Sequence, residues 1–320
     1  MFTIFLQLVT GFFILIKSAD WLVDGATSLA KRLGVSSFIV GLTVVAFGTT
    51  MPELAVNVLA NLRGSSDLVI GNILGSNISN ILLILGVAAL IYPLRMTSKT
   101  LWREMPFSLF AIMVLVFVAN DALIDASAIS IISRVDGFIL LAFMAIFLVY
   151  IFEISKNRNS GLEDLDIERR SWQFSTILIL SGIVGLALGS KWLVDGAVYL
   201  ARFFDVSEAL IGLTIVAIGT SLPELTTSAT AAYRHDDDIA IGNVIGANIF
   251  NIFWILGLSA VISPVVFDVS LNFDILIGAV ATGLLFAVMF VGQKMVLERW
   301  QGAVFIGVYL LYIVILIVRG

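Results

Sequence analysis

Apolar residues along this chain gather into ten long segments that are separated by short polar connections. The segments span residues 2–24, 37–62, 67–90, 104–120, 130–152, 173–197, 208–232, 239–262, 272–293 and 301–318. A helix of about 20 residues crosses the roughly 30 Å hydrocarbon core of a bilayer and satisfies its own backbone hydrogen bonds there. The pattern therefore predicts an all-α polytopic membrane protein with ten transmembrane helices.

The two halves of the chain repeat each other at an offset of 171 positions. Residues 41–57 align without a gap on residues 212–228, and residues 71–86 align on residues 242–257, with ten identities in each block. Each half holds five predicted spans, and an odd number obliges the second half to enter the membrane from the opposite side. Such inverted repeats are typical of secondary transporters. We expect a first five-helix repeat at 1–152, a short cytoplasmic linker at 153–172 and a second, inverted five-helix repeat at 173–320.

The distribution of basic residues predicts the orientation in the cell membrane. Twelve Lys and Arg residues lie in or beside the connections that follow odd-numbered spans, against four on the other side. By the positive-inside rule the first group is cytoplasmic, which places both termini outside. Residues 2–16 resemble the apolar core of a signal peptide. However, no basic residue precedes them and an equivalent segment recurs in mid-chain, so we expect a retained helix.

Composition agrees with a membrane protein and excludes other classes. Of the 320 residues, 60% are hydrophobic and 13% are charged, against roughly 45–50% and roughly 25% in soluble globular domains. The net charge of −5 provides no broad basic surface. The expected surroundings are therefore a lipid bilayer, and nucleic acid is excluded as a partner. The absence of cysteine excludes disulfides, thiolate metal sites and a cysteine nucleophile.

Two acidic residues, Glu53 and Glu224, occupy equivalent positions in the middle of predicted spans. Ionisable residues inside a membrane are costly to bury and mark ion pathways or binding sites by default. Each glutamate follows a proline, Pro52 or Pro223, which has no N–H for the carbonyl four residues earlier. We therefore predict that both helices are broken near the middle of the bilayer, with a carboxylate and free backbone carbonyls at each break.

Residues that offer a side-chain or backbone oxygen accompany each glutamate on the same helix face and on the span that follows, together with the alanines at equivalent positions. The repeated sets are Ala46, Thr49, Thr50, Ser76 and Asn80 in the first half, and Ala217, Thr220, Ser221, Ala247 and Asn251 in the second. Calcium takes six to eight oxygen ligands, and two carboxylates neutralise one divalent or two monovalent cations. The spacing therefore predicts an oxygen cage for Ca²⁺ in which Glu53 and Glu224 are joined by the carbonyls of Thr49 and Thr220.

These motifs resemble a known family. The segments Gly48-Thr49-Thr50-Met51-Pro52-Glu53 and Gly219-Thr220-Ser221-Leu222-Pro223-Glu224 are similar to the alpha-repeats of prokaryotic sodium/calcium exchangers, as are the blocks that begin at Gly71 and Gly242. The resemblance implies electrogenic exchange of sodium for calcium, three to one, without a cofactor, as the first and sixth spans slide past a rigid core. It implies sodium ligands as well as calcium ligands. The expected sodium ligands are Ala46, Thr50, Ser76, Ala217 and Ser221, with Asn80 and Asn251 in the middle of the cage.

Two positions depart from the prokaryotic pattern. Ala247 replaces a serine that helps to hold sodium, and Asn251 replaces an aspartate. In a related branch of the superfamily, an acidic residue at the position of Asn251 is associated with potassium dependence. The resemblance leaves open a proton/calcium antiporter with the same two glutamates, although the GNxxE motif of that branch is missing. The linker is too short for the regulatory domains of animal exchangers.

Two further hypotheses compete with the antiporter. An intramembrane hydrolase would also use paired carboxylates, but no HExxH or Gly-x-Ser-x-Gly motif lies in the spans. The polar residues could instead be purely structural. Thr and Ser often bond back to their own helix, and asparagine can join neighbouring helices.

Overall fold

The computed structural model describes the chain except for residues 1, 99, 125–128, 157–170, 204–216 and 320. Eight helices within this described part are long and apolar enough to cross a membrane. A bent pair, at Ser37–Thr49 and Met51–Leu62, makes a ninth candidate span. The predicted span at 208–232 lies partly outside the described residues, which resume at Ala217. The protein is therefore a helical, multi-pass membrane protein.

The helices follow the predicted apolar segments to within a few residues at most ends. Those of the first half are α1 (Phe2–Leu33), α2 (Ser37–Val40), η1 (Gly41–Val45), α3 (Ala46–Thr49), α4 (Met51–Leu62), α5 (Ser66–Ser79), η2 (Asn80–Ile84), α6 (Leu85–Ile91), η3 (Thr100–Glu104), α7 (Met105–Val118), α8 (Asp121–Ile124) and α9 (Arg134–Lys156). Those of the second half are α10 (Trp172–Phe203), α12 (Ala217–Thr220), α13 (Leu222–Tyr233), α14 (Asp237–Ile249), η5 (Phe250–Leu256), α15 (Gly257–Ile262), η6 (Val269–Leu271), α16 (Asn272–Val288) and α17 (Arg299–Arg319).

Two short antiparallel ladders join the halves. Strand β1 (Leu94–Arg95) pairs with β4 (Val296–Leu297), and β2 (Ser130–Ile132) pairs with β3 (Val265–Phe267). The start of the predicted span at 130–152 is therefore a strand, and the helix begins only at Arg134. Prolines at 93 and 264 explain where β1 and β3 begin, because the residue before a proline is driven out of the helical region. Tyr92 and Ser263 are accordingly extended, with ψ of 131° and 133°.

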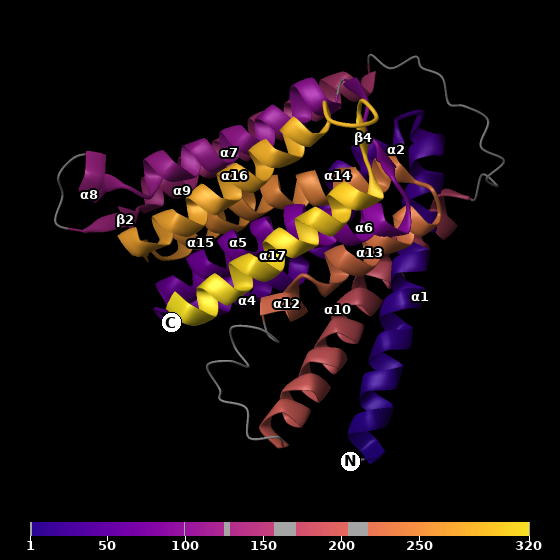
Figure 1. The fold of residues 1–320 in the computed structure, drawn as a ribbon, viewed down its shortest axis with the longest axis horizontal. Helices are drawn as coiled ribbons and strands as arrows, with labels where there is room; N and C mark the ends of the chain where they lie inside the picture. The colour runs from indigo at the N-terminus through magenta and orange to yellow at the C-terminus, as the bar shows by residue number, and fades with distance from the viewer. Residues whose placement is uncertain (1, 99, 125–128, 157–170, 204–216, 320) are drawn as a thin grey trace.

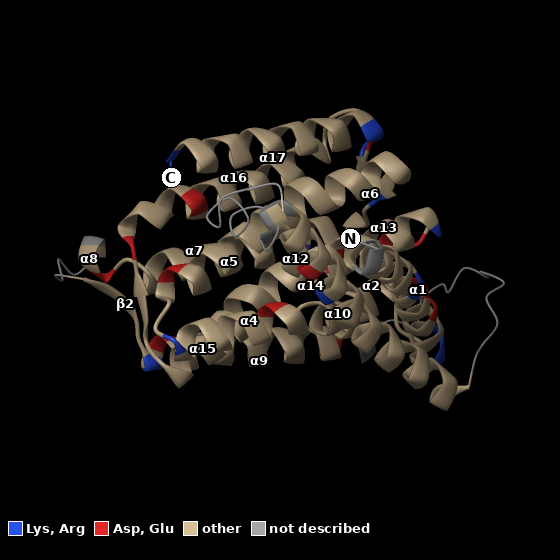
Figure 2. Ribbon diagram, turned by 90° about the horizontal axis from the view of Figure 1, so that it is seen from below, with Lys and Arg blue, Asp and Glu red and all other residues tan. Residues whose placement is uncertain are grey.

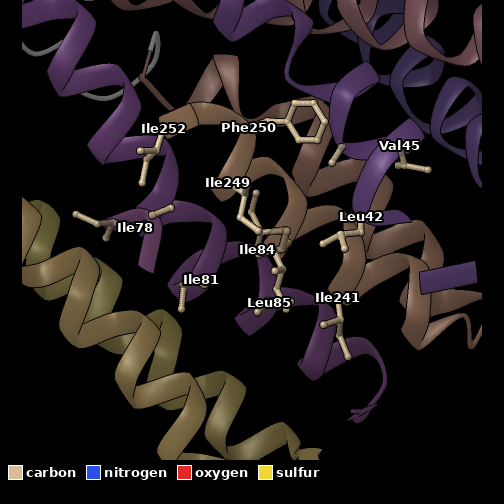
Figure 3. Packing of buried hydrophobic residues seen from close by; sticks show 14 of the residues in the cluster. Leu42, Val45, Ile78, Ile81, Ile84, Leu85, Ile241, Ile249, Phe250 and Ile252 are labelled. Carbon is tan, nitrogen blue, oxygen red and sulfur yellow. The ribbon is translucent and has the colours of Figure 1, made fainter. Parts of the chain in front are cut away.

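The centre of the molecule consists of two equivalent spans, α5–η2–α6 and α14–η5–α15. Their most apolar windows are 78% buried, against 28–39% for the other apolar helices. Figure 3 shows Ile84 of one span beside Ile249 of the other, with Leu42 of the bent helix to one side. Both spans contain a π-helical turn, at Asn80–Ile84 and Phe250–Leu256. Such turns are rare in proteins overall, and those that occur are often found at functional sites.

Helices α1 and α10 form an antiparallel pair that projects from the rest of the molecule (Figure 1). Glycines allow their backbones to approach closely, as in many membrane helix pairs. A Cβ atom added at Gly11 would lie 3.1 Å from the Gly189 carbonyl, and one added at Gly182 would lie 2.9 Å from the Ser18 carbonyl. The two contacts are exchanged by the offset of 171, so the pair is symmetric with respect to the repeat.

Charged residues lie mostly at helix ends, as Figure 2 shows. Within the described residues, the acidic side chains that are buried are Glu53, Glu104, Glu224 and Asp274. Asp274 accepts hydrogen bonds from Tyr312 at 3.0 Å and from Arg319 at 3.1 Å, so its charge is compensated. The two glutamates of the repeated motifs are in a different situation.

Candidate ion-binding site

The helices that carry the two glutamates are broken where the prolines predict. Helix α3 ends at Thr49 and α4 begins at Met51, while α12 ends at Thr220 and α13 begins at Leu222. The residues between them, Thr50 and Ser221, have nearly identical backbone angles, with ψ of 3° and 5°. The first break bends the span by 44°. The prediction of a break is confirmed in both halves.

Glu53 and Glu224 are buried, and their carboxylates lie near each other. Their exposed fractions are 1% and 0%, and the two carboxylates lie close enough to repel one another. Neither oxygen of either carboxylate accepts a hydrogen bond from any of the residues that the structure describes. A purely structural glutamate in a membrane would be bonded to a neighbour, as Asp274 is. The orphaned oxygens therefore favour a role in binding a cation.

Two amide oxygens are, like the carboxylate oxygens, buried without a hydrogen-bond partner among the described residues. Asn80 and Asn251 are 0% and 1% exposed, and the Oδ1 atom of each is buried without a hydrogen-bond partner in the described part of the chain. Together with the carboxylates they make six buried oxygen atoms that have no hydrogen-bond donor within the described part of the chain. No group of three or more His, Cys, Asp or Glu side chains suited to a metal occurs among the described residues. A cation in this region would therefore be held by two carboxylates and by neutral oxygens.

The hydroxyls near the first break are already bonded to the protein. Thr50 donates to the Ala46 carbonyl at 2.9 Å, which is the back-bonding that Ser and Thr commonly make. Thr49 lies 3.2 Å from the same carbonyl and 3.0 Å from Oδ1 of Asn243. The Thr49 hydroxyl also lies near the Glu224 carboxylate of the other half, although it is directed at Ala46 and Asn243 and does not reach hydrogen-bond geometry with that carboxylate. All three predicted residues are buried at the break, and an ion would have to exchange with these bonds to use the Ala46 carbonyl.

The remaining predicted residues lie around the second break. Ser221 donates to Ser76 at 3.4 Å, so these two hydroxyls meet across the halves. Thr220 is partly buried and donates to Oδ1 of Asn72 at 3.3 Å, which mirrors the bond between Thr49 and Asn243. Ala217 begins α12, and its side chain lies outside the described part. Ala247 is 0% exposed and brings no side-chain oxygen to the site.

Sequence reasoning overlooked a surrounding set of asparagines. Asn72 and Asn243 contact the two threonines, and Asn77 and Asn248 contact the amides of Asn251 and Asn80. All four occur as pairs at the offset of 171, inside the aligned blocks. The duplication was therefore a signal that could have found them. Their lack of charge and the frequency of asparagine at helix contacts made them resemble packing residues.

Known proteins are similar to this chain over most of its length. The model of a family described as sodium/calcium exchanger protein matches residues 3–153 and 174–318. The chain belongs to the sodium/calcium exchanger family. This exchanger is 35% identical to the sodium/calcium exchanger MaX1 of Methanosarcina acetivorans, with 98% of each chain covered. It is 39% identical to the putative antiporter CaxA of Alkalimonas amylolytica, over 81% of each chain.

A solved structure of the sodium-calcium exchanger NCX_Mj has the same fold. The TM-score is 0.82 at 31% identity, with 98% of this exchanger and 99% of that chain covered. The exchanger is thus a cation/Ca²⁺ antiporter of the membrane, with Ca²⁺ and Na⁺ as the ions that its family carries and no cofactor. It is a transporter and not an enzyme, so the hydrolase hypothesis is wrong.

Proposed function

We propose that this exchanger moves Na⁺ against Ca²⁺ across the cell membrane by alternating access, in an electrogenic cycle. The observation that carries the proposal is the set of six buried oxygens on Glu53, Glu224, Asn80 and Asn251, none bonded to a donor within the described residues. Ca²⁺ prefers such oxygen ligands in flexible geometry. The carbonyls of Thr49 and Thr220 would complete the calcium site, and Ala46, Thr50, Ser76, Ala217 and Ser221 would serve sodium.

The proposal includes an architecture of ten spans in two inverted repeats. The repeats are residues 1–152 and 173–320, joined by a cytoplasmic linker at 153–172, and both termini lie outside the cell. The antiparallel packing of α1 on α10 supports this relation, because these helices are equivalent in the repeat. The ladders β1–β4 and β2–β3 support it too, since each pairs a strand of one half with a strand of the other.

One cage serving both ions requires that they compete. The two carboxylates give the cage a charge of −2, which one Ca²⁺ neutralises, whereas the three Na⁺ of an electrogenic cycle leave the cage at +1. Burial of the uncompensated charge of −2 in the empty cage is costly, so the cage changes the side of the membrane to which it opens only when it is loaded. The projecting pair α1 and α10 is the element proposed to slide past the core (Figure 1). Because the empty cage cannot change sides, inward movement of one ion is coupled to outward movement of the other.

The test is uptake of radioactive calcium by proteoliposomes that contain the purified exchanger. Vesicles loaded with sodium and diluted into sodium-free medium should accumulate calcium, and an ionophore that collapses the sodium gradient should abolish uptake. A positive potential inside the vesicle should speed uptake, because each cycle moves more positive charge out as sodium than in as calcium. Calcium uptake that follows a pH gradient and ignores the sodium gradient would replace this proposal with proton/calcium exchange.

A further inference from the structure

Four buried asparagines connect the two halves at the centre of the core. Asn77 donates through Nδ2 to the backbone carbonyl of Asn248 at 3.3 Å, and Asn248 donates through Nδ2 to the backbone carbonyl of Asn77 at 3.2 Å. The two residues are 171 positions apart, so the bonds are reciprocal across the repeat. Asn80 then donates to Oδ1 of Asn248 at 2.9 Å, and Asn251 donates to Oδ1 of Asn77 at 2.9 Å.

This network determines which way each amide points. A backbone carbonyl only accepts hydrogen bonds, so the end of the Asn77 amide that faces Asn248 must be its NH₂ group. The other end of Asn77 is therefore an oxygen, and the facing atom of Asn251 must be a donor. The Asn251 oxygen is then directed away from Asn77, and it is one of the buried oxygens without a donor among the described residues. The same logic runs from the Asn77 carbonyl through Asn248 to Asn80.

We propose that Asn77 and Asn248 are positioning residues, each of which fixes the amide of an ion ligand so that its oxygen faces the cage. Asn77 acts on Asn251, and Asn248 acts on Asn80. An unconstrained amide could present its NH₂ group to the cation, which would repel it. Asn77 is held by the main-chain carbonyl of Asn248, and Asn248 by the main-chain carbonyl of Asn77. The pair Asn77–Asn251 and the pair Asn248–Asn80, called the two arms below, therefore do not depend on each other's side chains. The proposal rests on the cage named above and assigns a role to two residues outside it.

The two arms are not equally strong. The Asn251 amide also donates to the Ser76 hydroxyl at 3.2 Å, so both of its N–H groups are used. The position equivalent to Ser76 is Ala247, which offers Asn80 no such acceptor. Within the described residues the Asn80 amide therefore donates to Asn248 alone, and loss of Asn248 should be more damaging than loss of Asn77.

Crossed double-variant cycles test the pairing directly. The half-saturating Ca²⁺ concentration is measured in proteoliposomes for Asn77→Ala, Asn251→Ala and their combination, and for Asn248→Ala, Asn80→Ala and theirs. Each single change should raise this concentration about tenfold, as expected for the loss of about one hydrogen bond. Asn248→Ala should raise it more than Asn77→Ala. Each combination should be no worse than its Asn251→Ala or Asn80→Ala parent. The crossed combinations, Asn77→Ala with Asn80→Ala and Asn248→Ala with Asn251→Ala, should multiply, because those side chains belong to different arms.

A purely structural role predicts another pattern. If Asn77 and Asn248 only packed the core, their effects would multiply in every combination and would lower the maximal rate and the thermal stability together. That result would overturn the proposal. A wild-type exchanger whose calcium uptake ignores sodium would instead refute the proposed function, while the crossed cycles on Ca²⁺ would still be informative about positioning.

A gain of function provides a second test that does not depend on a truncated core. Ala247→Ser adds one hydroxyl at the position that mirrors Ser76. In the Asn248→Ala background it should restore part of the lost Ca²⁺ affinity by accepting a bond from Asn80. It should restore nothing in the Asn80→Ala background. Equal rescue in both backgrounds, or rescue in neither, would contradict the assignment.

Discussion

Removal of one carboxylate is the most direct test of the cage. Glu53→Gln and Glu224→Gln keep the shape of each side chain and reduce the cage charge from −2 to −1. Both glutamates are at most 1% exposed, so bulk water cannot solvate a cation that has lost one carboxylate partner. A buried ion left without its partner costs about 3–5 kcal/mol. At 1.4 kcal/mol per factor of ten, Ca²⁺ affinity should fall by about two to four orders of magnitude.

The assay is sodium-driven calcium uptake in proteoliposomes at increasing Ca²⁺ concentration, together with thermal stability of the purified variants. Both variants should fold and show no uptake at concentrations that saturate the wild type. Glu153→Gln, which changes an exposed glutamate at the end of α9, is the matched control and should transport normally. Wild-type rate and half-saturation in either cage variant would refute the site, because an uncompensated Ca²⁺ would then be tolerated in a buried position.

Three other predictions follow from the geometry. Pro52→Ala restores an N–H at the break, so the 44° bend should relax and calcium uptake should fall while thermal stability changes by less than about 1 kcal/mol. Gly189→Ala places a Cβ atom 3.0 Å from the Gly11 carbonyl and should destabilise the α1–α10 pair by about 1–3 kcal/mol in a melting experiment, whereas Gly283→Ala, with open space around it, should not. Burial raises the pKa of Asp236 above the ordinary pKa of an aspartic acid. The folded protein should therefore lose stability as the pH rises past that ordinary pKa and the carboxyl group ionises. Asp236→Asn should melt at a higher temperature than the wild type at neutral pH and at the same temperature in acid.

The positions of the helices and of the two breaks could be predicted from the sequence because local rules determine them. Apolar length sets the spans, and Pro52 and Pro223 remove a donor wherever they occur. The ladder at Ser130–Ile132 could not be predicted, since its partner strand lies more than 130 residues away and its apolar side chains resemble the start of a span. The asparagine network was hidden for a similar reason. Whether an amide binds an ion or orients another amide depends on tertiary contacts such as those of Asn77 and Asn248.

Because Asn80 and Asn251 are uncharged, the charge of the loaded cage differs between the calcium-carrying and the sodium-carrying steps of the cycle. Only the step that moves a net charge should depend on the membrane potential. With two carboxylates the calcium-loaded cage has no net charge, whereas a cage loaded with a third sodium ion carries +1. Moving one charge across the membrane is worth about 2.3 kcal/mol per 100 mV. Sodium self-exchange should therefore change with membrane potential, and calcium self-exchange should not. The measurement is isotope exchange at equal ion concentrations on both sides, with the potential clamped by potassium and valinomycin. Calcium self-exchange that depends on voltage would mean that the cage carries a charge other than −2, and the ligand set proposed here would be wrong.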